Sequence, residues 1–199
     1  AMEALAIIPK KKAVRAVRLE SPRQKNPFQY TPAVLVGGSK PPLWSRAMSI
    51  LAPGYEMIFV SGTASTKGQD VMYAGDPVRQ TLYTISSIEL LLKQRGASLK
   101  DIPQLRVYIK NPEHYGVIKR VIEKKFPNIP VIYSIADVCR HDWLVELEAF
   151  AFVGKKTSAS GNARSEARRG LAPFLQEKVP VPLTVNAKGT GTILKSKNG

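Results

Sequence analysis

Two carboxylates within an apolar segment are the residues of this chain best suited to chemistry. Leu144–Val153 is predicted to be a strand, and Glu146 and Glu148 lie two positions apart in it. Alternate side chains of a strand share one face, so both acids lie on the same side of the sheet. Desolvation raises the pKa of a carboxyl group in an apolar wall and makes it a proton donor near neutral pH. The alternative is a partly exposed glutamate paired with a basic neighbour.

The polar connection before this strand, residues 139–142, holds a second group of candidates. Arg140 could bind a substrate carboxylate through two parallel hydrogen bonds. Alternatively, Arg140 forms a salt bridge with Asp137 or Asp142 in the same turn. Cys139 is the sole cysteine, and nothing in the sequence lowers its pKa, so a thiolate nucleophile is not expected. We expect Cys139 to pack against a ligand or to be buried.

Strands and helices that could position these residues follow from the apolar spacing. The predicted strands are Glu56–Val60, Leu105–Lys110, Val131–Val138 and Leu144–Val153, with one further strand near Ala33–Val36. Asp76-Pro77 has the cap and first-turn residues of a helix, whose apolar face continues to Gly96. A shorter helix begins at Asn111-Pro112 and ends before Pro127. Ser61-Gly62 is predicted to be a tight corner, followed by a polar loop to Gly75.

This order of elements predicts an α+β fold, with two helices on one face of a mixed sheet. No further helix is predicted that could cover the opposite face. We therefore expect a second copy of the chain to cover it.

The net charge of +15 is concentrated outside the predicted domain. Residues 1–46 and residues 154–199 each carry +7, whereas residues 47–153 carry +1. We divide the chain accordingly into a basic N-terminal arm (1–46), a folded domain (47–153) and a basic, flexible C-terminal tail (154–199). Contact with nucleic acid through the two basic flanks is conceivable but not favoured, because aromatic residues are not interleaved with the basic ones in the tail.

Several classes of protein are disfavoured by the composition. No apolar run approaches the length needed to span a bilayer, and the N-terminus does not resemble a secretory signal, so a cytoplasmic protein is expected. One cysteine excludes an internal disulfide, and the two distant histidines, His114 and His141, do not form a metal site. No cofactor is predicted.

Several segments together resemble the RidA/YjgF superfamily in order and spacing, over about residues 55–153. They are Phe59-Val60-Ser61-Gly62, Arg95-Gly96-Ala97-Ser98-Leu99-Lys100-Asp101, Val107-Tyr108 and Leu144-Val145-Glu146-Leu147-Glu148-Ala149. The resemblance implies a chorismate mutase-like fold that forms homotrimers, with sites in the clefts between subunits. It agrees with the uncovered sheet face.

A finer resemblance is to the C-terminal half of the chorismatases. It rests on Ser21-Pro22-Arg23-Gln24, Trp44-Ser45-Arg46-Ala47, Ser61-Gly62-Thr63-Ala64-Ser65, Gly75-Asp76 and above all Ala136–Glu146. Chorismatases protonate the methylene carbon of an enol ether and release pyruvate. The resemblance implies that Glu146 is the proton donor, that Arg140 anchors a carboxylate of a small substrate, and that Arg46 is a second anion-binding residue. Cys139 and Tyr133 would be walls of the site.

Two features differ from the families that the chain resembles. RidA deaminases, which act on imines, use an arginine in the strand that here carries Tyr133, so imine deamination is the less favoured activity. Chorismatases are longer, with an additional RidA-like half, and residues 66–73 lack the histidines expected in their loop. A RidA-fold protein that binds a small ligand or acts as a scaffold without catalysis therefore stays as an alternative.

Overall fold

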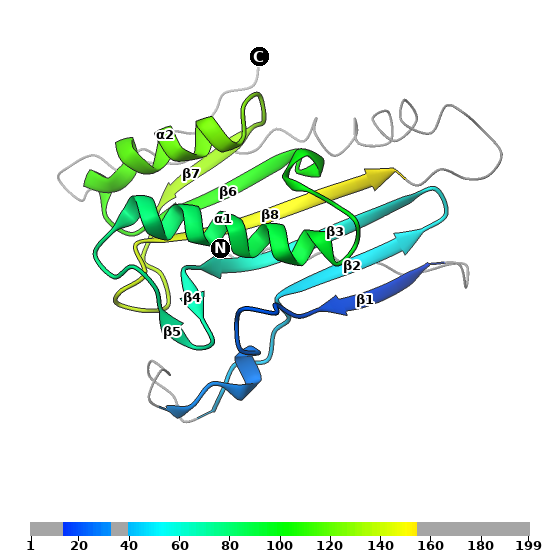
Figure 1. The fold of residues 1–199 in the computed structure, drawn as a ribbon, viewed down its shortest axis with the longest axis horizontal. Helices are drawn as coiled ribbons and strands as arrows, with labels where there is room; N and C mark the ends of the chain where they lie inside the picture. The colour runs from blue at the N-terminus through cyan, green and yellow to red at the C-terminus, as the bar shows by residue number, and fades with distance from the viewer. Residues whose placement is uncertain (1–13, 33–39, 155–199) are drawn as a thin grey trace, which may run out of the picture. The chain divides into compact units, whose positions relative to one another are not determined.

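A six-stranded mixed sheet forms the centre of the computed structural model, which describes residues 14–32 and 40–154 (Figure 1). Its strands lie in the order β1-β2-β3-β8-β6-β7, and only β6 and β7 run parallel. They are β1 (Arg15–Leu19), β2 (Ala47–Ala52), β3 (Tyr55–Ala64), β8 (Val145–Gly154), β6 (Gln104–Ile109) and β7 (Val131–Ile135). A separate hairpin pairs β4 (Thr66–Lys67) with β5 (Asp70–Val71).

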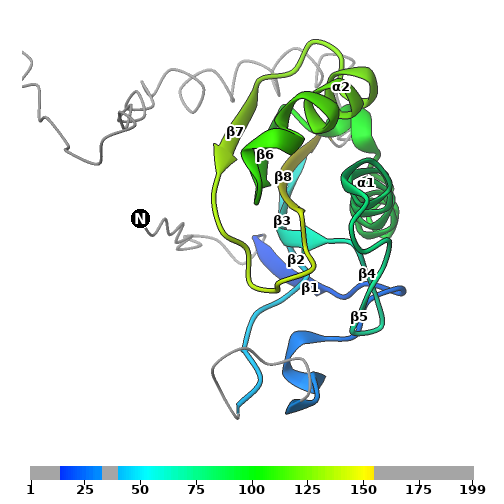
Figure 2. The same cartoon turned by 90° about the vertical axis from the view of Figure 1, so that its left-hand side faces the viewer.

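Both α-helices lie on one face of the sheet, and no helix of the described region lies on the other (Figure 2). Helix α1 (Pro77–Lys93) begins where predicted, because the Asp76 carboxylate accepts a hydrogen bond of 2.8 Å from the Arg79 amide. Gly96, at a φ of +68°, follows its end. Helix α2 (Tyr115–Lys125) follows the short 3₁₀ turn Pro112–His114. Two more 3₁₀ turns span Pro27–Gln29 and Leu99–Asp101.

The core lies between the sheet and the helices. Leu147 of β8, Ile58 of β3 and Leu105 of β6 are fully buried there against Ile88 and Leu92 of α1. The alternation predicted for β8 is confirmed, because Val145, Leu147 and Ala149 are buried on the helix side. The opposite face of β8 therefore carries Glu146 and Glu148.

Three local features differ from the sequence prediction. Strands β1 and β2 were not predicted, and β1 brings part of the expected N-terminal arm into the sheet beside β2. The predicted corner at Ser61-Gly62 is instead an irregularity inside β3, which continues to Ala64. The strand expected near Ala33–Val36 and the C-terminal tail from residue 155 lie outside the described residues.

In the part of the chain that the structure describes, neither helix is both long and apolar enough to cross a membrane.

Candidate active site

Glu146 lies in the middle of the sheet, on the face without helices. Its strand β8 is flanked by β3 and β6, and the register places Glu146 beside Ala64 of β3 and Tyr108 of β6. Glu148, on the same face, accepts a hydrogen bond of 2.9 Å from the Tyr108 hydroxyl. The two acids predicted to share a face do share it, but only Glu148 has such a hydrogen bond.

Gly62 provides the space in which the Glu146 carboxyl group lies. The pairing of β3 with β8 shifts register between Val60 and Thr63, so Gly62 lies in a bulge opposite this part of β8. A Cβ atom at Gly62 would overlap Glu146 Oε1 and would lie 2.9 Å from its Cδ. A glycine is therefore required if Glu146 is to keep this rotamer.

The surroundings of Glu146 favour its protonated form. Burial and, to a smaller extent, the negative charge of Glu148 raise the pKa of Glu146, Arg46 opposes both effects, and together they raise the pKa to about 7. Near neutral pH, Glu146 is therefore present in both its protonated and its ionised form. This is the property that a carboxylic acid needs in order to protonate carbon under physiological conditions.

A consequence for stability follows from the raised pKa. The folded chain binds more protons than the unfolded chain between the ordinary pKa of 4.5 and about 7, so stability falls as pH rises through this interval. Glu146→Gln removes that loss. The difference in the free energy of unfolding between this variant and the parent should therefore increase, in favour of the variant, by up to about 3 kcal/mol from pH 4.5 to pH 8. Because the side chain keeps partial exposure, this is an upper limit. Urea unfolding at both pH values measures the gain, and an equal difference at both would contradict the raised pKa.

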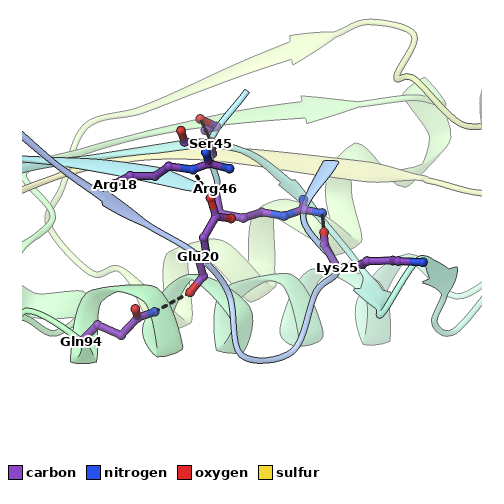
Figure 3. Close-up of polar contacts among 7 residues, drawn as sticks. Arg18, Glu20, Lys25, Ser45, Arg46 and Gln94 are labelled. Atoms are coloured by element: carbon purple, nitrogen blue, oxygen red, sulfur yellow. Dashed lines mark hydrogen bonds and ion pairs between the residues drawn. The ribbon is translucent and has the colours of Figure 1, made fainter. Parts of the chain in front are cut away.

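Arg46 is a buried cation on the strand-β2 side of Glu146. The residue is 2% exposed, and its Nη2 donates hydrogen bonds to the Lys25 carbonyl, at 2.5 Å, and to the Tyr30 hydroxyl. Figure 3 shows its side chain reaching the backbone of Lys25. The guanidinium lies 4.7 Å from the centre of the Trp44 ring, and its buried Nε has no hydrogen-bond partner.

Arg140, in the β7–β8 connection, is a second arginine whose guanidinium has an N–H group without a hydrogen-bond acceptor. Its Nη1 donates to the Gln69 carbonyl in the β4–β5 hairpin, whereas its buried Nη2 has no partner. The rings of Tyr30 and Trp143 each lie 4.9 Å from the guanidinium. Burial lowers the pKa of Arg140, and the positive charge of Arg46 acts in the same direction.

Neither arginine is paired with a carboxylate of the described region. The salt bridge considered between Arg140 and Asp137 or Asp142 is not formed. Asp137 instead pairs with Lys110 at 3.2 Å, and Asp142 forms no ion pair with Arg140. Asp70 attracts Arg140 without forming an ion pair. A buried guanidinium (Arg46) and a half-buried one (Arg140) without a carboxylate partner lose hydration energy that no ion pair restores, and an anionic ligand would satisfy both of them.

The loop that carries Arg140 is held by hydrogen bonds from two side chains that belong to other elements. The Lys110 ammonium donates to the carbonyls of Arg140, at 3.2 Å, and His141, at 3.0 Å. The fully buried Gln80 of α1 donates to the Asp142 carbonyl at 2.8 Å and accepts from the Leu144 amide at 2.9 Å. The loop is thus held in one conformation.

Cys139 lies near Glu146, whereas Tyr133 lies away from it. The Cys139 residue is exposed, and partial burial of its thiol, followed by the charge of Glu146, raises its pKa. Tyr133 pairs with Val107 and packs on the core side, with its ring 5.4 Å from that of Tyr115. Burial raises the pKa of Tyr133 to about 12. Within one chain, therefore, Tyr133 and Glu146 lie on opposite faces of the sheet.

Several residues of the site were not identified from the sequence, among them Tyr30, Trp44, Trp143 and the carbonyl of Gln69. The bulge at Gly62 could have been recognised from the sequence, since a glycine inside a strand often marks a bulge or a close approach of another group to the backbone. The described ranges contain no group of three or more His, Cys, Asp or Glu side chains that could hold a metal ion.

A sequence model of the family described as Endoribonuclease L-PSP matches residues 44–153, which is more than half of the chain. The chain belongs to the RidA/YjgF family. The matched range includes Glu146, Arg140, Arg46 and Gly62, whereas Tyr30 precedes it.

Two curated relatives of this RidA/YjgF chain come from Streptomyces. The 3-hydroxybenzoate synthase of Streptomyces hygroscopicus is 29% identical over an alignment of 146 residues, which covers 66% of this chain and 42% of that protein. A chorismatase of Streptomyces rapamycinicus is 28% identical over 123 residues, covering 56% of this chain and 37% of that protein. The chain therefore spans about two fifths of the length of these relatives.

Solved structures show the same fold. A chorismatase crystal structure superposes with a TM-score of 0.63 at 24% identity, over 69% of this chain and 44% of that one. A YjgF/YER057c/UK114 family member from Mycobacterium tuberculosis gives a TM-score of 0.51 at 25% identity, over 70% of this chain and all of that one. The α+β fold with two helices on one face of a mixed sheet is thereby confirmed.

Proposed function

We propose that this RidA/YjgF chain provides the catalytic site of a chorismatase-type enzyme, which cleaves the enol ether of chorismate, or of a related small carboxylated compound, and releases pyruvate. The observation that carries the proposal is the raised pKa of Glu146 near two guanidinium groups, the buried Arg46 and the half-buried Arg140, that have no carboxylate partner in the described region. The similarity to a 3-hydroxybenzoate synthase and to a chorismatase supports it.

The chemistry requires one proton and one molecule of water. Glu146 transfers its proton to the terminal methylene carbon of the enol ether, and the ether carbon becomes an oxocarbenium ion. Water adds to that carbon, the resulting hemiketal breaks its bond to the ring oxygen, and pyruvate and a ring alcohol leave. The proton released on addition of water restores the acid form of Glu146.

The two arginines bind the substrate in this scheme. Arg140 anchors one carboxylate through its free Nη2, and Arg46 offers its Nε to a second anionic group. Charge-assisted hydrogen bonds from a guanidinium are directional, so they would fix the enol ether relative to Glu146. Cys139 forms part of the wall beside the acid.

Incubation with chorismate and an assay for pyruvate test the proposal. We expect steady release of pyruvate at a rate proportional to protein concentration. Binding of chorismate without release would instead indicate a RidA-fold ligand-binding protein, and release of ammonia from an imine would indicate a deaminase. Either outcome would overturn the enol-ether assignment.

We also propose that a homotrimer forms through the sheet face that carries no helix. Partly exposed aromatic pairs lie there, with ring centres 5.0 Å apart for Phe59 and Phe150 and 5.4 Å for Tyr55 and Phe152. Burial of such a face is a large apolar gain.

Phe152→Glu should abolish this association, because it would bury a carboxylate in the subunit contact. Light scattering coupled to size-exclusion chromatography should give about three times the protomer mass for the parent and the protomer mass for the variant. Leu82→Glu, on the exposed side of α1, is the matched control and should leave the mass unchanged. A monomeric parent would contradict the proposed trimer.

A further inference from the structure

A segment before strand β2 is built into the candidate site. Residues 23–25 run beside the β4–β5 hairpin, where the Lys25 amide donates to the Gly68 carbonyl at 2.7 Å and the Gly68 amide donates to the Arg23 carbonyl at 2.8 Å. The buried Gln24 side chain donates to the Ala64 carbonyl at 3.2 Å. These contacts bring the segment to the end of β3, near the bulge at Gly62.

Arg23 fastens the same segment to helix α1. Its Nη1 donates to the hydroxyl groups of Ser86, at 2.6 Å, and Ser87, at 3.2 Å, and its guanidinium lies 4.4 Å from the centre of the Tyr83 ring. The segment is therefore held at two places, by the hairpin and by the helix. Its conformation is set before any ligand binds.

Tyr30, at the end of this segment, contacts both arginines of the site. It is 8% exposed, and its ring centre lies 4.9 Å from the Arg140 guanidinium and 5.6 Å from that of Arg46. Its hydroxyl accepts a hydrogen bond from Arg46 Nη2. Trp44 contacts Arg46 and Trp143 contacts Arg140, so aromatic rings alternate with guanidinium groups.

We propose that Tyr30 is a positioning residue, which holds Arg46 and Arg140 so that one free N–H of each can bind a separate carboxylate of one dicarboxylate substrate. The inference rests on the proposed function and extends the site to Tyr30.

An aromatic ring stabilises the two guanidinium groups in a different way from a carboxylate. An aspartate or glutamate in the place of Tyr30 would occupy the guanidinium N–H groups in a bidentate pair and would block an anionic ligand. A ring face attracts the positive charge and leaves the N–H edge free. Without a counter-ion or a ring, the two positive charges would repel each other and separate. The ring of Tyr30 therefore keeps the pair together and available.

The test compares Tyr30→Leu with Tyr30→Phe in the chorismate assay. Tyr30→Leu loses both ring contacts, and its KM should rise about 10- to 100-fold. Its kcat should stay within about threefold of the parent, because Glu146 is untouched. Tyr30→Phe keeps the ring and loses only the hydroxyl, so its KM should rise by less than about tenfold. Phe28→Leu, in the 3₁₀ turn that precedes Tyr30, is the matched control and should keep the parent KM.

Binding is followed independently of turnover by tryptophan fluorescence. The only two tryptophans of the chain, Trp44 and Trp143, contact the two arginines, so titration with chorismate reports occupancy of this site. The Kd from fluorescence should rise with KM in Tyr30→Leu, whereas the Kd of the monocarboxylate benzoate should change much less.

The outcomes separate this inference from the proposed function. If the parent binds chorismate without releasing pyruvate and Tyr30→Leu weakens that binding, the role of Tyr30 stands and the enol-ether activity fails. If the parent releases pyruvate and Tyr30→Leu keeps the parent KM, or loses kcat with KM unchanged, the role of Tyr30 is overturned. A parent that neither binds nor cleaves chorismate overturns both.

Discussion

Glu146→Gln is expected to lower kcat for release of pyruvate from chorismate by about 10²- to 10⁴-fold, the usual contribution of a positioned general acid. Glutamine has the shape of the protonated carboxyl group but cannot give up a proton to carbon. The variant should keep the fold, because it replaces a group that burial already drives toward its neutral form. Initial rates measured with a pyruvate assay give the ratio directly.

The pH dependence of catalysis by the parent is a second test of Glu146 as the general acid. The active form carries the proton, so kcat/KM, which reports the pKa of the free enzyme, should be constant at low pH and fall tenfold per pH unit above about 7. Glu89→Gln, which removes a carboxylate of α1 that pairs with Lys93 at 3.0 Å, should reproduce the parent profile. Parent-like turnover by Glu146→Gln would remove Glu146 from the mechanism.

Gly62→Ala should lower kcat by about 10²-fold while leaving most of the stability intact. The added methyl group would occupy the position of Glu146 Oε1, so the carboxyl group must rotate away. The end of a flexible side chain can make such a move without displacing the sheet. A shift of about 1 Å at a reacting group is enough for a loss of this size. Steady-state kinetics and a thermal melt, measured on the same sample, separate the two effects.

Gly116→Ala is the matched control for this substitution. A Cβ at Gly116, in helix α2, would meet only Arg120 Nη1, at 3.8 Å. Alanine favours a helix over glycine by about 1 kcal/mol, so this variant should melt higher and keep the parent activity. If Gly62→Ala also keeps the parent kcat, the carboxyl group does not act from its place above Gly62.

The helices and the central strands could be predicted from the sequence because local signals determine them. Asp76-Pro77 supplies the cap and first turn of α1, and Gly96 follows its end at a positive φ. The alternation of apolar and acidic residues gave the two faces of β8 correctly. In each of these cases the pattern within one element decides its structure.

Strands β1 and β2 could not be predicted because their pairing comes from tertiary contacts. Strand β1 has an exposed, basic sequence, and its place at the sheet edge depends on its pairing with β2. The bulge in β3 likewise depends on the register of β8, so Ser61-Gly62 suggested a corner when read alone.

The site could be predicted only in part. Glu146, Arg140 and Cys139 belong to one stretch of sequence, and the structure keeps them together, with Arg46 beside them. Tyr133 lies on the other face because the strand register, rather than proximity in sequence, decides which way a side chain points. Tyr30 is more than a hundred positions from Glu146, and only the docking of the N-terminal segment brings it to the arginines.

Direct titration of the Glu146 carboxyl group is the most decisive measurement. Infrared difference spectra between the parent and Glu146→Gln isolate the C=O stretch of the protonated acid, and its intensity can be followed from pH 4 to pH 9. A midpoint near 7 is the predicted result. A midpoint near the ordinary glutamate value of 4.5 would show an ionised, solvated group at neutral pH, which could not donate the proton that enol-ether cleavage requires.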